Sequence, residues 1–299
     1  MTNYFEGVCP VVNVPFDENE RVDYEDLGRV IDFTLNAGCA SVCLFAFNSE
    51  PHKMSNDEKK ETIAAFMKHI NGRAKALIGI VENSISGCIE LAQYAEKCGA
   101  DGIILYPPAL STPSGDALLS YFKRIAESVK IDVMIQDNPR STGVTMSFEF
   151  LLDAFKGIEN FKHLKVECPI PIRKLKKLVD MTNGEILCYS GNGGIHAIEA
   201  FLSGAAGIMP GAVASGWFVE MFNDIKEGRV DKARTDFERM LPFLWYEDQS
   251  LEFYIACEKE LLKRMGVIKS AAIREPACKL TDEEREELFI LYDRATREV

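Results

Sequence analysis

A lysine and a glutamate two residues apart are the pair most able to do chemistry in this sequence. Lys165 and Glu167 stand in FKHLKVE (161–167), which we interpret as a strand. Side chains two apart on a strand share a face, so both would point to one side. A buried lysine that is partly neutral near pH 7 can attack a ketone and form an iminium, the electron sink for breaking a bond beta to the carbonyl. Two other interpretations stay open, an outward lysine lying along a helix and a purely structural ion pair.

Glu167 beside such a lysine would be suited to proton transfer. If burial keeps its pKa near the working range, its carboxyl could take a proton from C3 of a substrate or give one to a departing hydroxyl. This chemistry needs no metal ion and no organic cofactor, because the lysine supplies the electron sink. The histidines and cysteines are scattered, without the spacing of a metal site. We therefore expect an enzyme without a cofactor.

Other polar residues stand where neighbouring candidate strands end, which is where a parallel barrel places its catalytic groups. Gln136 closes one of these strands, and its amide can position a hydroxyl but cannot take its proton. The candidate substrate-binding residues share this placement: Asn48, Ser49, Glu50, Tyr106, Gly191 and Asn192. The last two belong to SGNGG (190–194), whose backbone N–H groups could hold an anion, although a tight turn explains the pattern equally well.

The elements that must position these residues follow an alternating pattern. Short apolar runs alternate with longer segments of helical spacing, which predicts a parallel sheet covered by helices. Eight runs are expected to be strands: residues 7–14, 41–47, 75–81, 101–106, 131–136, 161–167, 185–190 and 206–211. Ser55 and Glu58 form a capping box, and Gly38, Gly99 and Gly204 each close a helix before a strand. The sequence predicts the α/β class, as a (β/α)₈ TIM barrel over residues 1–214.

Strand signals stop near residue 215. Residues 215–299 are rich in Glu, Lys and Leu at helical spacing, and no low-complexity linker precedes them. We expect a C-terminal helical region over 215–299 that packs on the barrel.

The composition argues against several kinds of partner. The 299 residues include 34 Lys and Arg against 46 Asp and Glu, a formal charge of −12 that repels nucleic-acid phosphates and anionic lipid. No apolar run approaches the roughly 20 residues that span a bilayer, and the opening MTNYFEGVCPVV lacks a signal-peptide pattern. The nine cysteines lie mostly in apolar runs, as reduced core residues do. We expect a cytoplasmic protein that binds neither nucleic acid nor membrane.

At these residues the chain resembles the dihydrodipicolinate synthase and N-acetylneuraminate lyase superfamily, and the likeness covers nearly the whole chain. Members carry a Schiff-base lysine on the sixth strand, which puts that role on Lys165. Their carboxylate-binding loop and the helix opening that follows it fall on AFNSE (46–50) and SNDEK (55–59). Their fifth strand ends in a segment that DNPRSTG (137–143) matches. The resemblance implies a class I lyase for a small 2-keto acid.

Departures from the superfamily pattern favour one of its branches. Gln136 replaces the tyrosine that relays protons in synthases and sialic acid lyases, and the carboxylate loop keeps a single hydroxyl, Ser49. Three segments are instead similar to the L-2-keto-3-deoxyarabonate dehydratases: NSEP (48–51), QDNP (136–139) and KVECP (165–169). This resemblance implies dehydration of a 2-keto-3-deoxy sugar acid, with Glu167 taking over the tyrosine's proton transfer.

Three alternatives to dehydration remain. A pyruvate-dependent aldolase and a dihydrodipicolinate synthase-like condensation use the same lysine, whereas a non-catalytic sugar-acid binding protein would use the barrel alone. The resemblance also implies a homo-oligomer, a tetramer or a dimer.

Overall fold

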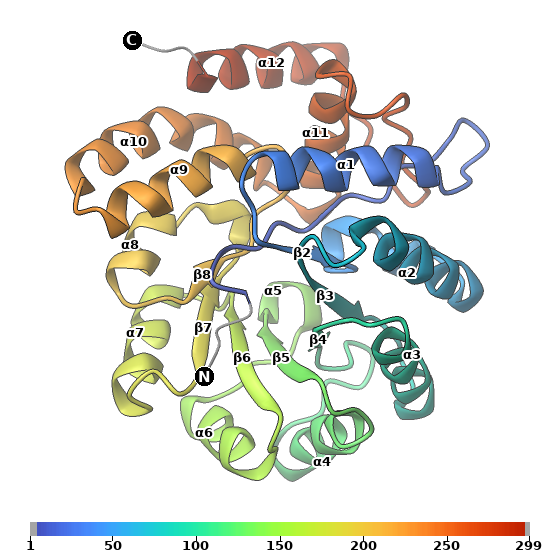
Figure 1. Cartoon of the computed structure of the whole chain (residues 1–299), viewed down its shortest axis with the longest axis vertical. Coiled ribbons are helices and arrows are strands. Elements are labelled where there is room, and N and C mark those ends of the chain that lie inside the picture. Colours follow the sequence, from blue (N-terminus) through green and yellow to red (C-terminus); the bar gives the residue numbers. More distant parts are fainter. Residues whose placement is uncertain (1–4, 297–299) are drawn as a thin grey trace.

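Residues 5–296 are described by the computed structural model of this chain, in which eight parallel strands form a barrel with helices around it (Figure 1). Hydrogen-bonded neighbours follow the order β1-β8-β7-β6-β5-β4-β3-β2. The strands are β1 Gly7–Val8, β2 Ser41–Leu44, β3 Lys75–Ile80, β4 Gly102–Leu105, β5 Asp132–Asp137, β6 Phe161–Val166, β7 Leu187–Ser190 and β8 Gly207–Ile208. The predicted TIM barrel followed by C-terminal helices is confirmed.

The first strand is shorter than predicted. Only Gly7–Val8 pairs as a strand, next to β8. Pro10 has no N–H group and can only accept, which it does from the N–H of Cys43 at 2.8 Å. Val11 then bridges Cys43 on one side and Gly211 on the other. This irregular segment closes the barrel between β8 and β2.

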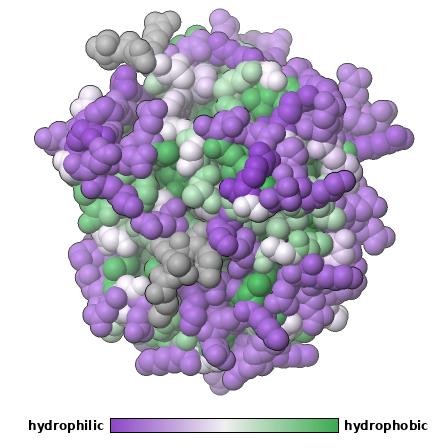
Figure 2. Space-filling model, in the orientation of Figure 1, coloured by the Kyte–Doolittle hydropathy of each residue, from purple (hydrophilic) through white to green (hydrophobic). Residues whose placement is uncertain are grey.

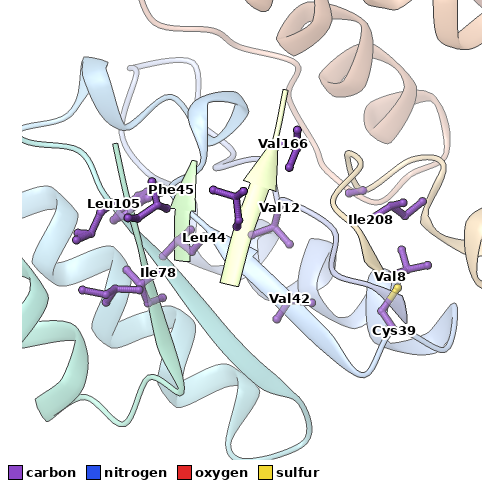
Figure 3. Packing of buried hydrophobic residues seen from close by; sticks show 14 of the residues in the cluster. Val8, Val12, Cys39, Val42, Leu44, Phe45, Ile78, Leu105, Val166 and Ile208 are labelled. Atoms are coloured by element: carbon purple, nitrogen blue, oxygen red, sulfur yellow. The ribbon is translucent and has the colours of Figure 1, made fainter. Parts of the chain in front are cut away.

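Alternate side chains of the strands fill the two sides of the sheet. Those that point into the barrel form an interior cluster that includes Cys9, Cys43, Met134 and Tyr189. Those that point outward pack beneath the helices in a larger cluster. Figure 3 labels ten members of this larger cluster, among them Val42, Ile78, Leu105, Val166 and Ile208. Lys165 belongs to the inward set, because its register neighbour Tyr189 on β7 is an interior residue.

The helices between the strands begin and end where local signals place them. They are α1 Tyr24–Asn36, α2 Asn56–Ile70, α3 Ile85–Lys97, α4 Gly115–Ala126, α5 Pro139–Thr142, α6 Phe148–Gly157, α7 Pro171–Met181 and α8 Ala197–Leu202. The predicted capping box of Ser55 and Glu58 is present at the start of α2. Gly38, Gly99 and Gly204 have φ values of +93°, +93° and +86°, the left-handed conformation that closes a helix at low cost only with glycine.

Helices fill the last part of the chain. They are α9 Ser215–Lys226, α10 Val230–Glu247, α11 Leu251–Arg264 and α12 Asp282–Thr296, and α10 to α12 lie along one side of the barrel in Figure 1. Trp217 of α9, Phe243 of α10 and Tyr292 of α12 pack with ring centroids 5.5 to 5.8 Å apart. The helices predicted for this region are therefore present, and the domain boundary at residue 214 stays a prediction.

The surface drawn in Figure 2 is mostly hydrophilic, with small apolar areas between the polar side chains. No helix of residues 5–296 combines the length and the apolar character needed to cross a bilayer. Over the same residues, no three His, Cys, Asp or Glu side chains are grouped so as to hold a metal ion.

Candidate active site

Lys165 lies inside the barrel and lines a small cavity at the carboxyl ends of the strands. Its side chain is 5% exposed, and its Nζ lies 3.3 Å from Oε1 of Glu167. The cavity has a volume of about 90 Å³. Lys165 and Glu167 share a face, as their spacing predicts, and the outward orientation of the lysine is excluded.

Four donors converge on the carboxylate of Glu167. Its Oε2 accepts from Nε2 of Gln136 and, at 2.9 Å, from Nδ2 of Asn138. Its Oε1 faces the ammonium of Lys165 and accepts from the N–H of Asn192 at 2.9 Å. With donors on both oxygens, the carboxylate is held in one orientation beside the amine.

The glycine-rich turn after β7 fits closely around this carboxylate. Asn192 has a φ of +51° and opens the short 3₁₀ helix η3 Asn192–Gly194. A Cβ atom on Gly191 would lie 1.9 Å from Oε1 of Glu167, a distance at which no side chain fits. Gly191 and Asn192 are thus brought to the predicted site. The sequence makes the backbone N–H of Asn192 a candidate hydrogen-bond donor to a bound anion. In the structure this N–H already donates to the carboxylate of Glu167.

Lys165 contributes its amine to the lining of this cavity. Gln136 on β5 is its register neighbour on one side, and apolar and thiol side chains surround it within the barrel. Burial raises the pKa of Cys9 to about 12, against smaller opposite effects of a bond to Ser41 and of the Lys165 charge. Burial likewise raises the pKa of Cys43. These thiols therefore stay protonated and unreactive at neutral pH.

The loop after β2 brings only part of its predicted residues to the cavity. Phe47 and Asn48, in the 3₁₀ helix η1 Phe47–Ser49, line the wall. Ser49 is fully buried behind them, where its hydroxyl donates to the carbonyl of Val12 at 2.6 Å and accepts from the N–H of Phe45 at 3.0 Å. The hydroxyl therefore fastens the loop to the first strand segment.

Glu50 also lies behind the wall. It is fully buried at the junction of η1 and the 3₁₀ helix η2 Pro51–Lys53, with a φ of +58°. Its carboxylate pairs with Nζ of Lys53 at 3.1 Å and with Nζ of Lys259. The structure thus places Asn48 at the cavity and uses Glu50 in a buried ion-pair network.

Tyr106 lies next to the cavity, beyond the ring of Phe47. The ring centroids are 4.7 Å apart, and the hydroxyl of Tyr106 donates to the carbonyl of Phe45 at 3.1 Å. Burial raises its pKa well above the usual range, so the phenol stays neutral. A Cβ on Gly79 would lie 1.9 Å from that carbonyl oxygen, so glycine is required for this approach. Tyr106 lines a second, adjoining cavity of about 480 Å³.

Several residues of the first cavity were not singled out from the sequence. Asn138 and Arg140 belong to DNPRSTG, so a signal for them existed. Arg140 is half-exposed, and its Nη1 lies 3.3 Å from Oδ2 of Asp248. The turn after β8 and the N-terminal part of α11 add further wall residues, among them Gly211, Leu251 and Tyr254. Nothing in the sequence pattern connects the residues of α11 with the strands.

Comparison with known proteins places the chain in a family. A family model described as the dihydrodipicolinate synthetase family matches residues 4–293. The chain is 26% identical over 293 residues to the L-2-keto-3-deoxyarabonate dehydratase of Azospirillum brasilense, covering 96% of this chain and 94% of that protein. It is also 26% identical over 286 residues to the 4-hydroxy-tetrahydrodipicolinate synthase of Oceanobacillus iheyensis, covering 95% of each.

The fold agrees with these sequence matches. The crystal structure of dihydrodipicolinate synthase from Rhodopseudomonas palustris matches with a TM-score of 0.92 and 25% identity, over 98% of this chain and 99% of that chain. The resemblance inferred from the sequence motifs is confirmed, since the family model and the relatives span nearly the whole chain. This chain belongs to the dihydrodipicolinate synthetase family, a family of lyases.

Proposed function

We propose that this protein is a Schiff-base lyase that removes water from a small 2-keto-3-deoxy sugar acid. The observation that carries the proposal is the amine of Lys165, buried at a small cavity 3.3 Å from the carboxylate of Glu167. The similarity to a 2-keto-3-deoxyarabonate dehydratase supports the choice of reaction.

The first step forms the imine. Glu167 takes a proton from the ammonium of Lys165, and the free amine attacks C2 of the keto acid. A carbon–nitrogen bond forms, and the C2 oxygen leaves as water after receiving one proton from the attacking nitrogen and the proton held by Glu167. The product is an iminium that draws electrons from C3.

The second step eliminates the C4 hydroxyl. The Glu167 carboxylate removes a proton from C3, and the enamine electrons expel the oxygen on C4. The same carboxyl returns its proton to that oxygen, which departs as water. Hydrolysis of the imine and tautomerisation then release a keto-aldehyde and restore Lys165, with one water lost overall.

Gln136 favours this elimination over aldol cleavage. Cleavage requires a base at the C4 hydroxyl, and an amide cannot take that proton. Its Nε2 is bonded to Glu167, whereas its Oε1 is buried without a hydrogen-bond partner among residues 5–296. That oxygen is suited to accept a hydrogen bond from a substrate hydroxyl.

The substrate carboxylate would lie against the β2 loop. The N–H groups of Phe47 and Asn48 are in the first turn of η1 and have no acceptor within that helix. Ser49 would act indirectly, because its hydrogen bond to the carbonyl of Val12 holds this turn in place. Arg140 adds positive charge to the cavity wall.

The test is reductive trapping. Borohydride with pyruvate or a 2-keto-3-deoxy pentonate should add a stable mass to Lys165, and Lys165→Arg should abolish both the adduct and turnover. Lys162→Arg is the matched control, because Lys162 lies on the same strand and is only partly buried. Absence of any adduct would favour the non-catalytic sugar-acid binding protein.

Products separate the remaining alternatives. A panel of 2-keto-3-deoxy acids analysed by mass should give products that have lost one water. Release of pyruvate, or its condensation with an aldehyde at a comparable rate, would instead establish the aldolase or synthase reaction.

We further propose a homo-oligomer, a tetramer or a dimer. Family membership supports this, together with exposed apolar side chains such as Leu110 and Ile170, which are 91% and 63% exposed. A sedimentation mass of 33.4 kDa at micromolar concentration, the mass of one chain, would contradict it.

A further inference from the structure

Helix α11 holds the turn that follows β8. The hydroxyl oxygen of Tyr254 accepts from the N–H of Gly211 at 2.9 Å. One helical turn later, Oε2 of Glu258 accepts from the N–H groups of Ala212 and Val213 at 2.9 and 3.3 Å. Three consecutive backbone N–H groups beyond β8 are therefore bonded to one face of α11. Gly211 itself lines the candidate active site.

The next residue of the same helix holds the loop after β2. Nζ of Lys259 pairs with Glu50 and donates to the carbonyl of Ala272 at 2.9 Å. It also lies 4.2 Å from the ring centroid of Phe16. Glu50 directly follows the η1 turn that lines the cavity. A second lysine, Lys53, joins Glu50 to Glu252 in the first turn of α11, at 3.1 and 2.6 Å.

These charges are costly where they lie. Glu50, Glu258 and Lys259 are all fully buried, and none of them lines the cavity. Taking charges out of water opposes folding, and apolar residues of similar size usually stabilise such a position as well or better. Packing alone therefore does not account for them. Their shared feature is that they bind two segments of the active-site wall, the β8 turn and the β2 loop, through hydrogen bonds and an ion pair.

The close approach of α11 is built into the β8 turn. A Cβ atom on Gly211 would lie 2.5 Å from the carboxyl carbon of Glu258, so the carboxylate reaches the backbone only because this residue is glycine. The β8 turn and the β2 loop flank the first strand segment, through Val11, which bridges Gly211 and Cys43. One helix thus fixes both neighbours of that segment.

We propose that Glu258 and Lys259 are positioning residues, which set the spacing of the β8 turn and the β2 loop and so the place of the substrate carboxylate relative to Lys165. The proposal takes its ligand, a 2-keto acid, from the proposed function. The contacts of α11 with the two wall segments can be tested without this ligand.

The first test is Lys259→Met, with Lys263→Met as control, since Lys263 is exposed on the same helix. We expect Lys259→Met to raise KM for the 2-keto acid about 10- to 100-fold with a smaller change in kcat, because a displaced wall misplaces the carboxylate. The control should match the wild type. A wild-type KM in Lys259→Met would overturn the role of this residue.

A double variant separates positioning from stability. In Lys259→Met the buried carboxylate of Glu50 keeps only Lys53 among residues 5–296 as an ion-pair partner. Adding Glu50→Gln removes that buried charge, so the melting temperature should recover. KM should stay raised, because the tie that Lys259 makes between α11 and the loop is still absent. Recovery of KM together with the melting temperature would show that Lys259 acts only through stability, and would overturn the proposal.

Glu258 is tested by conservative rescue. Glu258→Gln keeps an oxygen acceptor for Ala212 and Val213 and should hold KM within about threefold of the wild type, whereas Glu258→Ala removes the acceptor and should raise KM about tenfold or more. Equal KM values in the two variants would overturn the positioning role of Glu258.

Amide hydrogen exchange tests, independently of activity, whether α11 restrains the β2 loop and the β8 turn. Lys259→Met should speed exchange in peptides covering residues 45–53, and Glu258→Ala in peptides covering 209–213, while Lys263→Met changes neither. If wild-type protein forms no adduct on Lys165, the proposed function fails but these exchange rates still test the hold of α11. Unchanged exchange in both variants would overturn the proposal.

Discussion

Two buried glutamates of this molecule have opposite surroundings. Glu167, after β6, faces the ammonium of Lys165 and accepts from Gln136, Asn138 and the backbone of the β7 turn. Glu247, the last residue of α10, is fully buried, but neither of its carboxylate oxygens has a hydrogen-bond partner in the part of the chain that the structure describes. One carboxylate is surrounded by donors, whereas the other has none.

The difference lies in the segments that reach each side chain. Burial, reinforced by the neighbouring carboxylates of Glu258 and Asp248, raises the pKa of Glu247 well above its usual range. A carboxyl in that environment holds its proton and behaves as a neutral group. The donors around Glu167 come from β5, the residue Asn138 that follows it, β6 and the turn after β7, so they hold this carboxylate in one orientation. The residue type alone does not distinguish these roles.

The largest effect is expected from removing the proton acceptor at the donor-rich site. Glu167→Gln should lower kcat about 10²- to 10⁴-fold, because an amide cannot move the C3 proton. Borohydride trapping with pyruvate should persist at a lower rate, since Lys165 remains and trapping needs no proton transfer at C3, but Glu167 no longer assists imine formation. Steady-state kinetics and mass analysis of the trapped protein measure the two effects. Glu185→Gln, at an exposed position before β7, should leave both unchanged.

An active Glu167→Gln variant would remove the functional contrast between Glu167 and Glu247. If Glu167→Gln turned over substrate at a wild-type rate, Glu167 would be a structural partner of Lys165, and the proton would move through another group.

A smaller loss of activity should follow from moving the carboxylate of Glu167 relative to its donors without removing it. In Gly191→Ala the new methyl group would overlap Oε1 of Glu167, so the carboxylate must leave its present position beside Lys165. We expect kcat to fall about 10- to 100-fold. Gly157→Ala is the control, because nothing lies within 4 Å of a Cβ there. A wild-type kcat in Gly191→Ala would show that the orientation of Glu167 is not critical.

Local patterns explain how far the sequence could predict this fold. Apolar runs, a capping box and three helix-closing glycines depend on neighbours in sequence, and they gave the eight strands and the helices between them. The first strand was overestimated because its pairing depends on distant partners. Pro10 and Val11 meet Cys43 and Gly211, which no local pattern identifies.

The same distinction applies to the site. The common face of Lys165 and Glu167 follows from strand parity, and the geometry agrees with it. The direction of the Ser49 hydroxyl depends on Val12, on another strand segment, so the sequence could not show that it points away from the cavity. Tyr254 was missed because only the packing of α11 brings it to the wall.

The smallest expected effect concerns stability at the donor-poor site. The pKa of Glu247 is raised above its unfolded value of 4.5, so the folded protein holds a proton that the unfolded chain releases. The free energy of unfolding should therefore decrease as pH rises above about 5, because the unfolded chain then releases a proton that the folded protein retains. Glu258, whose pKa burial raises to about 7, adds to this decrease below that pH.

Glu247→Gln replaces the proton-holding carboxyl with a neutral amide of similar shape. The free energy of unfolding of this variant should therefore fall less steeply with pH, and its stability relative to the wild type should rise with pH. Denaturant unfolding at pH 5.5, 6.5 and 7.5 measures the slopes, with Glu238→Gln, at an exposed position on the same helix, as the control. Parallel curves for the wild type and Glu247→Gln would mean that Glu247 loses its proton at the same pH in the folded and unfolded chain, and the contrast with Glu167 would then rest on hydrogen bonding alone.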